Sequence, residues 1–339
     1  MRRRRTIIPI FIPHQGCPHR CVFCNQHRTA RMVKGLPSAA ELQEEVRIWL
    51  DGRRRRGSSE VQVAFYGGSF TALPLEVQEG LLGALKPFLE DGEVDSLRLS
   101  TRPDAVDEEV VELLRSSGVR TVELGVQSMD PEVLRLSSRG YGPEVVPEAL
   151  KLLKEGGFEV GVQLMLGLPG DTPERFLRTV EETVKLKPHF VRLYPTLVIK
   201  GTALEAWFHR GFYRPLDLEE AVELAAEAVK ALEGVGIEVV RMGLQPTEEL
   251  QRALVAGPYH PAFGQLVRSR LLYERARSLL EGKGLRKALF EVAPEDLSDF
   301  YGQHRENWRR LKEEFELEEL SVLPEHGLGR GELRLVEAV

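Results

Sequence analysis

The sequence predicts an α/β fold, a partial (β/α)6 barrel followed by a small C-terminal α/β appendage. Short apolar strand segments alternate six times with helical segments over residues 6–194, which is the pattern of parallel βαβ units. Glycine and polar residues follow directly after these strand segments. In a barrel such ends share one mouth, where barrel enzymes keep their chemistry. An open doubly wound sheet is the alternative, but its G-x-G-x-x-G turn is absent from the sequence.

The predicted strands are short runs rich in apolar and β-branched residues. They cover residues 6–12, 61–66, 96–100, 121–125, 158–166 and 190–194. The predicted helices between them cover residues 38–50, 75–89, 107–116, 131–136, 144–156 and 172–186. Their ends carry recognisable signals: Ser38 and Glu41 form a capping box, Pro131 stands in a first turn, and Gly156 is a stop.

The pattern changes near residue 235. An amphipathic helix over 217–232 precedes a strand over 237–241 and a glycine- and proline-rich stretch over 244–261. A strong helix over 265–281 and a second over 307–318 then predict a compact α/β unit. We therefore predict a core domain of residues 1–235 and an appendage of residues 236–339.

Composition limits the classes of function. Of the 339 residues, 42% are hydrophobic and 29% charged, which describes a soluble globular protein. No apolar run approaches the ~20 residues that span a bilayer, and no signal peptide is expected at the N-terminus, so we expect no membrane partner. The net charge of −6 excludes a whole-molecule electrostatic attraction to nucleic acid. Two runs of four arginines, at 2–5 and 53–56, are locally basic. Such a run can bind nucleic acid, but it is more often an ordinary solvent-exposed surface.

All three cysteines of the chain lie in one C-x3-C-x2-C motif, at Cys17, Cys21 and Cys24. The odd count and tight loops exclude a disulfide framework, whereas three thiolates on a short loop can converge on one soft metal centre. Two centres fit. Zinc would recruit a fourth ligand from His14, His19 or His27. A [4Fe–4S] cluster would use the three thiolates and leave one iron open. Reduced, clustered cysteines also predict a cytoplasmic location.

At this motif the sequence resembles the radical SAM superfamily. There the open iron binds the methionine part of S-adenosylmethionine (SAM), which is cleaved reductively to a 5′-deoxyadenosyl radical. Further segments resemble the branch that contains the Elongator catalytic subunit (elongator protein 3) and the oxygen-independent coproporphyrinogen oxidases. These segments are YGGS at 66–69, TRPD at 101–104, ELGVQS at 123–128, MLGLPG at 165–170 and LYPT at 193–196. The resemblance implies the TIM-like partial barrel of the radical SAM type, with residues 246–339 similar to the appendage of short bacterial relatives.

The resemblance gives the cysteines and the first glycine turn specific roles. The three cysteines would hold three irons of the cluster. The turn after the second strand would bind the methionine amino group through backbone carbonyls that a side chain would obstruct. The residues of this turn are Gly67, Gly68 and Ser69. Phe23, directly before the last cysteine, stands where the superfamily usually has an aromatic residue.

Polar side chains at later strand ends match further SAM contacts. Gln127 and Gln163 match positions that bind the ribose hydroxyls, where an amide can donate and accept. Arg139 matches a basic residue near the methionine carboxylate. Ser100 and Arg102 complete the predicted cofactor site, although Ser100 stands where the Elongator type usually has an acidic residue. Taken singly, Gln163 also fits an interior polar residue and Arg139 a surface residue.

The resemblance implies a radical SAM enzyme that receives electrons from a donor such as a flavodoxin or ferredoxin. It also suggests tRNA as the substrate, with the arginine runs neutralising phosphates. Both runs precede strands and so belong to the face opposite the cluster. Because the sequence stops at residue 339, we expect no counterpart of the acetyltransferase domain that follows in the Elongator subunit. The cysteine spacing is also narrower than the spacing typical of that subunit.

Two other functions remain open. A coproporphyrinogen-type enzyme would usually carry a further cysteine close behind the third, where this chain has Asn25 and Gln26. A non-catalytic module with a structural zinc loop, binding RNA or protein, is the second alternative.

Overall fold

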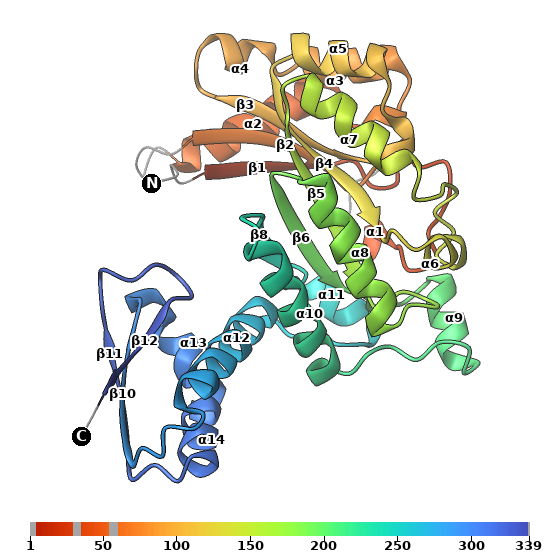
Figure 1. Ribbon diagram of the computed structural model, residues 1–339. Helices are drawn as coiled ribbons and strands as arrows, with labels where there is room; N and C mark the ends of the chain where they lie inside the picture. Colours follow the sequence, from red (N-terminus) through yellow and green to blue (C-terminus); the bar gives the residue numbers. More distant parts are fainter. Residues whose placement is uncertain (1–4, 30–34, 54–59, 338–339) are drawn as a thin grey trace.

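A seven-stranded parallel sheet dominates the fold. The computed structural model describes residues 5–29, 35–53 and 60–337 (Figure 1). The described strands of the sheet follow the order β1-β2-β3-β4-β5-β6-β8. They are β1 (Arg5–Phe11), β2 (Glu60–Tyr66), β3 (Ser96–Thr101), β4 (Val119–Gln127), β5 (Glu159–Leu166), β6 (Phe190–Pro195) and β8 (Glu238–Met242). Because β1 and β8 form the two edges, the sheet curls without closing. The predicted partial barrel is confirmed.

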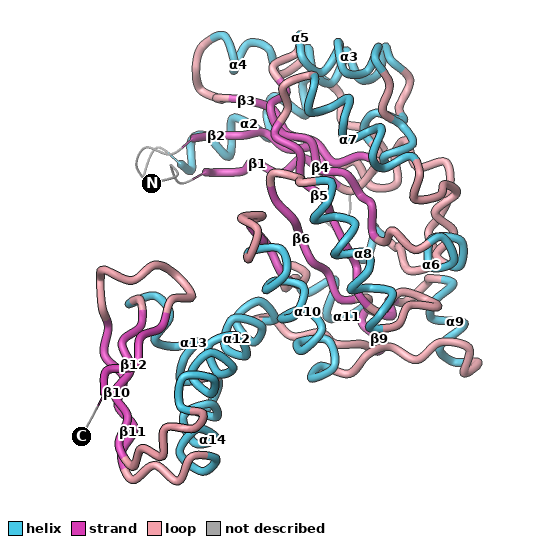
Figure 2. Tube along the Cα trace, viewed as in Figure 1, coloured by secondary structure: helices cyan, strands magenta, loops and turns pink. Residues whose placement is uncertain are grey.

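The helices of this part pack along the sheet and at its ends (Figure 2). They are α1 (Gln26–Thr29), α2 (Ala39–Arg53), α3 (Leu75–Gly83), α4 (Lys86–Glu90), α5 (Glu108–Ser116), α6 (Pro131–Leu136), α7 (Val145–Glu155), α8 (Pro173–Leu186), α9 (Ala203–His209), α10 (Leu218–Glu233) and α11 (Glu248–Ala253). Three of these, α1, α9 and α11, were not predicted. No described helix is both long and apolar enough to cross a membrane.

Local signals explain most helix ends. Glu41 accepts the backbone N–H of Ser38 at 2.8 Å, which confirms the predicted capping box. The predicted helix over 75–89 is instead two helices, α3 and α4. Pro87 explains the break, because it has no N–H to donate to the carbonyl of Gly83 and its ring would clash with the preceding turn.

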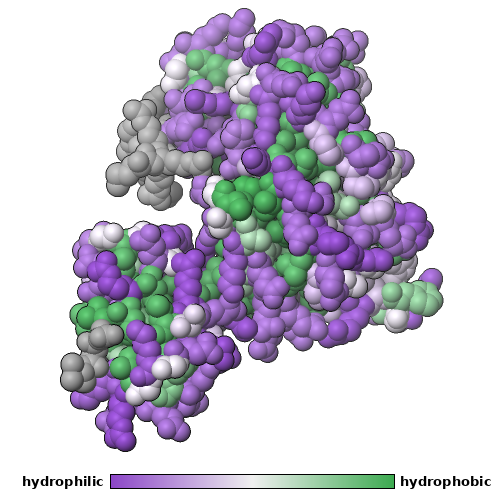
Figure 3. Space-filling model, viewed as in Figure 1, coloured by the Kyte–Doolittle hydropathy of each residue, from purple (hydrophilic) through white to green (hydrophobic). Residues whose placement is uncertain are grey.

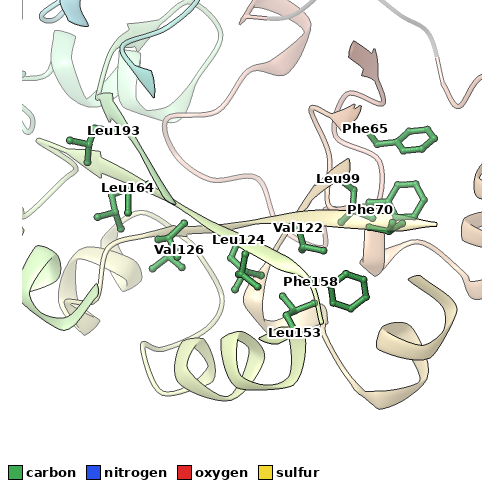
Figure 4. Close-up of a cluster of buried hydrophobic side chains, with 14 of the residues drawn as sticks. Phe65, Phe70, Leu99, Val122, Leu124, Val126, Leu153, Phe158, Leu164 and Leu193 are labelled. Atoms are coloured by element: carbon green, nitrogen blue, oxygen red, sulfur yellow. The ribbon is translucent and has the colours of Figure 1, made fainter. Parts of the chain in front are cut away.

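The strands alternate between an apolar face and a polar face. The side chains of Leu99, Val122 and Leu124 lie on the side of the sheet where α7 contributes Leu153 to the core (Figure 4). Residues next to them in sequence, such as Arg98 and Glu123, are buried on the other face and pair there. The concave side of the half-barrel is therefore lined by polar groups, which is where a ligand can be held.

The predicted strand over 237–241 exists as β8 and pairs in parallel with β6, so the main sheet has seven strands where six were predicted. The predicted glycine- and proline-rich stretch contains α11 and β9 (Leu254–Ala256), and β9 pairs with β7 (Val198–Ile199). The predicted domain boundary at residue 235 falls between α10 and β8, and the division into two domains stays a prediction.

The C-terminal part forms a three-stranded sheet in the order β11-β10-β12, packed on helices around its own apolar cluster. Its elements are α12 (Phe263–Leu280), β10 (Lys287–Val292), α13 (Leu297–Tyr301), α14 (Glu306–Glu314), β11 (Glu319–Pro324) and β12 (Leu333–Glu337). Trp308 of α14 donates its indole N–H to the carbonyl of Leu320 at 3.0 Å, which ties helix to sheet. Apolar side chains gather over this sheet in the space-filling view (Figure 3).

Candidate metal and cofactor site

A cavity of about 850 Å³ is lined by the C-terminal ends of the main-sheet strands and the loops that follow them. Every residue predicted to bind the metal or the cofactor lines this cavity. These residues are Cys17, Cys21, Phe23, Cys24, Gly67, Gly68, Ser69, Ser100, Arg102, Gln127, Arg139 and Gln163. The structure therefore brings together residues separated by up to 146 positions in sequence (163 − 17), while the role of each residue stays a prediction.

The cysteine loop is held against the turn that follows β2. The backbone N–H of Ser69 donates to the carbonyl of Gln15 at 2.9 Å, and that of His14 donates to Gly67 at 2.8 Å. A Cβ atom on Gly68 would lie 2.5 Å from the carbonyl oxygen of Gln15 and 2.7 Å from that of Ile12. Glycine is thus required for the two backbones to approach each other.

The thiols themselves fit a centre that binds thiolates. Burial raises the pKa of Cys17, and burial raises that of Cys24 to about 12. Both thiols therefore hold their protons until a metal displaces them. In the described part of the chain no three acidic, histidine or cysteine side chains already converge on a metal position. Three thiols on one cavity wall nevertheless supply the donor set of a [4Fe–4S] cluster with one open iron.

Arg139 links the cysteine loop to β4. Its Nη1 donates to the sulfur of Cys21 at 3.0 Å, and its Nη2 donates to the carbonyl of Gly125 at 2.5 Å. The hydroxyl of Tyr141 accepts from Nη2 at 2.7 Å and donates to the same carbonyl at 2.8 Å. Only 6% of Arg139 is exposed, so it is not the surface residue that the sequence alone allowed.

Arg102, the first residue after β3, supports this arrangement. Its guanidinium forms a two-pronged pair with Asp104, with both N–O distances at 2.8 Å. Nη2 also donates to the backbone carbonyl of Arg139 at 2.6 Å. Most of the N–H donors of Arg102 are thus already bonded to protein groups. This favours a role in holding Arg139 in place, in addition to the predicted contact of Arg102 with SAM.

The two glutamines reach the cavity differently. Gln127 ends β4 at a register shift and has a φ of 69°, a left-handed conformation uncommon for a residue with a side chain. Gln163 of β5 is part of the polar interior, because its Nε2 donates to Glu123 at 2.9 Å. The hydroxyl of Ser100 lies 3.5 Å from the same Nε2. Ser100 and Gln163 are therefore neighbours on the cavity wall.

Glu123 organises the polar interior and was missed as a site residue. It is fully buried, and its two oxygens pair with Arg98 Nε and Arg192 Nη1, each at 2.6 Å. The hydroxyl of Tyr66 also donates to it at 3.1 Å. Burial opposes ionisation, but the two arginines outweigh it and hold the pKa of Glu123 below its usual range. The sequence did carry a signal for Glu123, because it is a charged residue between the apolar residues Val122 and Leu124 of a strand.

The residues proposed for zinc or RNA are placed only in part. The imidazole Nε2 of His14 accepts the backbone N–H of Gln26 at 3.0 Å, so one of its nitrogens is engaged. The side chains of His27 and Arg53, and the whole of residues 2–4 and 54–56, lie outside the part of the chain that the structure describes. Arg5 is described and pairs with Glu60 at 3.1 Å and with Glu159 at 2.8 Å, at the strand ends opposite the cysteine loop.

Comparison with known proteins identifies relatives of this chain. Among curated relatives, an uncharacterized protein of Methanocaldococcus jannaschii is 29% identical over 225 residues, which covers 64% of this chain and 69% of the relative. The tRNA uridine(34) acetyltransferase of the same organism is 28% identical over 260 residues, 66% of this chain. The match covers only 48% of that relative, so the chain spans about half the length of the acetyltransferase.

A solved structure shares the fold. The archaeal Elp3 of Methanocaldococcus infernus with an N-terminal deletion matches 84% of this chain and 65% of its own, with a TM-score of 0.61 and 23% identity. Two family models also match: the radical SAM superfamily over residues 11–183, and the radical SAM C-terminal domain over residues 188–273. The chain therefore belongs to the radical SAM superfamily of enzymes, whose members use a [4Fe–4S] cluster and S-adenosylmethionine.

Proposed function

We propose that this chain binds a [4Fe–4S] cluster through Cys17, Cys21 and Cys24 and uses it to cleave SAM. The observation that carries the proposal is that one cavity at the strand ends is lined by the cysteine loop and by all the predicted SAM contacts. When bound, the cluster supplies the electron that releases a 5′-deoxyadenosyl radical from SAM. The protein must then hold the substrate close to that radical and exclude water.

The residues around the cysteine loop would position the cofactor. The turn of Gly67, Gly68 and Ser69 presents backbone next to the loop and would take the methionine amino group. Arg139 would attract the methionine carboxylate, since a buried guanidinium keeps its charge at all accessible pH values. Gln127 would bind the ribose hydroxyls together with Gln163.

The remaining predicted contacts would complete the cofactor site. Phe23 offers an apolar surface beside the cluster. Ser100 and Arg102 would close the wall between β3 and β4. We also propose that the protein works in the cytoplasm with a one-electron donor such as a flavodoxin or ferredoxin, because its thiols must stay reduced.

We propose RNA as the substrate, with tRNA favoured by the relatives. A tRNA uridine(34) acetyltransferase matches two thirds of this chain (66%), but this chain covers only about half of that protein (48%). Activity on tRNA is therefore a proposal for this chain. A tetrapyrrole of the coproporphyrinogen type is the alternative substrate, and anaerobic turnover of coproporphyrinogen would favour it.

Metal analysis tests the cluster. After anaerobic reconstitution with iron and sulfide, the protein should be brown and hold about four irons per chain. Variants in which Cys17, Cys21 or Cys24 is replaced by alanine should each lose the cluster. A colourless protein that retains one zinc per chain after anaerobic purification would replace this proposal with the structural zinc loop.

tRNA binding at two salt concentrations tests the substrate. If the arginine runs contact phosphates, the affinity should fall by about 0.7–0.9 log units per log unit of salt for each contact. A variant with Arg53–Arg56 replaced by glutamine should lose part of this dependence. Undetectable or salt-insensitive binding by the wild type would remove RNA and leave a small-molecule substrate.

A further inference from the structure

Two arginines lie side by side near the edge of the main sheet, away from the cysteine loop. Arg192 of β6 and Arg241 of β8 are direct partners in the pairing of these strands, which adjoin at one end of the sheet (Figure 1). Both line the cavity. Like charges directly opposite each other on neighbouring strands are destabilising, so the pair requires a compensating group.

The described carboxylates do not compensate both arginines. Glu123 pairs with Arg192 at 2.6 Å, but its other oxygen pairs with Arg98, also at 2.6 Å. Two guanidinium groups on one carboxylate leave one positive charge in excess. Arg241 makes no ion pair within the described residues and donates instead to a backbone carbonyl at 3.2 Å and to the amide oxygen of Gln245 at 2.8 Å. The exposed Glu249 lines the same cavity without pairing with either arginine.

Arg192 also has an unused donor. Its Nε is buried and has no hydrogen-bond acceptor among the described residues. The rings of Tyr66 and Tyr194 each lie 5.6 Å from its guanidinium carbon, which favours the cation but does not supply an oxygen acceptor. Because buried donors are nearly always satisfied in folded proteins, an unpaired one in a cavity wall indicates a ligand acceptor.

We propose that Arg192 and Arg241 bind an oxyanion of the substrate, either a phosphate ester or a carboxylate. The inference rests on the proposed function, because a radical formed from SAM must meet its substrate in this cavity. Adjacent guanidinium forks suit the oxygens of such a group. The pair lies on β6 and β8, whereas the predicted SAM contacts come from the cysteine loop after β1, from β2 to β5 and from the loops after these strands. The methionine carboxylate is assigned to Arg139, so the oxyanion belongs to the substrate.

Calorimetric titration of the full, cluster-loaded chain with SAM present tests the pair. The probes are inorganic phosphate, acetate and a short uridine oligoribonucleotide, each at low ionic strength. Arg241→Gln should weaken binding of the preferred oxyanion about tenfold to a hundredfold, the loss expected for charge-assisted hydrogen bonds. Arg192→Lys keeps a cation beside Glu123 and should still weaken binding, because the planar fork is lost. Arg286→Gln, which removes an exposed arginine of the appendage, is the matched control.

The probes separate the two sources of the oxyanion. Tight binding of phosphate and of the oligoribonucleotide, but not of acetate, assigns a phosphate ester, and the reverse assigns a carboxylate. If the wild type and Arg241→Gln bind the probes with equal affinity, the proposal is overturned. It is also overturned if Arg241→Gln loses affinity for SAM by the same factor as it loses affinity for the probe. Because binding is measured without turnover, failure of SAM cleavage in the wild type would count against the proposed function and not against the anion site.

Discussion

Arg139 Nη1 donates a hydrogen bond to the sulfur of Cys21, 3.0 Å away, across 118 positions of sequence. The contact joins the loop after α6 to the cysteine loop, and the same guanidinium also donates a hydrogen bond to the carbonyl of Gly125. One buried side chain thus sets the distance between the predicted cluster ligand Cys21 and the end of β4, where the predicted SAM contact Gln127 lies. Changes at Arg139 should therefore affect the cluster and the cofactor together.

Replacement of Arg139 should weaken the binding of SAM. Arg139→Lys should bind SAM at least about tenfold more weakly, because an ammonium cannot serve the sulfur, the Gly125 carbonyl and the cofactor carboxylate at once. Equilibrium dialysis of SAM against the cluster-loaded protein measures the effect. Arg135→Lys is the control, since Arg135 is exposed and its ion pair among the described residues is with Glu132, one turn away. An unchanged SAM affinity in Arg139→Lys would refute the assignment.

Glu123 should dominate the stability of the barrel interior. Glu123→Gln leaves Arg98 and Arg192 without a buried counter-charge, so the free energy of unfolding should fall by about 3–5 kcal/mol. Urea denaturation measures the change. Glu112→Gln breaks an exposed pair with Arg115 and should alter stability by no more than about 0.5 kcal/mol. Similar losses in both variants would contradict the role given to Glu123.

The contact between the cysteine loop and the turn after β2 should tolerate no side chain. Gly68→Ala places a methyl group against the carbonyls of Ile12 and Gln15, so the loop must shift and iron incorporation should drop by more than half. Gly80→Ala is the control, because a Cβ there meets nothing within 4 Å and alanine favours the helix by about 1 kcal/mol. Full iron loading of Gly68→Ala would show that the approach is not needed.

Much of this site follows from local sequence, and the rest does not. Three cysteines in one loop and glycine turns after apolar strands are local patterns, so the predicted ligands and SAM contacts could be named and do line one cavity. The pairing of Glu123 with Arg192 depends on the register and curl of three strands, β4, β5 and β6, which no local pattern specifies. Pro87 was a local signal for the break between α3 and α4, but the helical periodicity of the apolar residues over 75–89 predicted one continuous helix.

Asp171 should make stability depend on pH. Burial, the largest effect, raises the pKa of its carboxyl to about 7, while the backbone N–H groups of Gly167 and Thr172 and nearby Arg175 oppose the rise and Asp130 adds to it. The folded chain therefore keeps this proton up to about pH 7, whereas the unfolded chain loses it near the ordinary value of 3.8. Since the folded state binds more protons between these values, its stability falls as the pH rises through this window.

Comparison with an isosteric variant isolates this effect. Between pH 4 and pH 8, the stability of the wild type relative to Asp171→Asn should fall by about 3–4 kcal/mol. Denaturation curves of both proteins at several pH values measure the difference. A difference that is constant, or that grows in favour of the wild type as the pH rises, would show that the carboxyl is already ionised in the folded protein.

Formation of 5′-deoxyadenosine tests the central claim most directly. The anaerobically reconstituted protein is reduced with dithionite in the presence of SAM, and the products are separated by chromatography. We predict 5′-deoxyadenosine and methionine from the wild type, and none above background from Cys17→Ala, Cys21→Ala or Cys24→Ala. SAM left intact by a wild-type protein that carries about four irons, or equal cleavage by the three variants, would contradict the account.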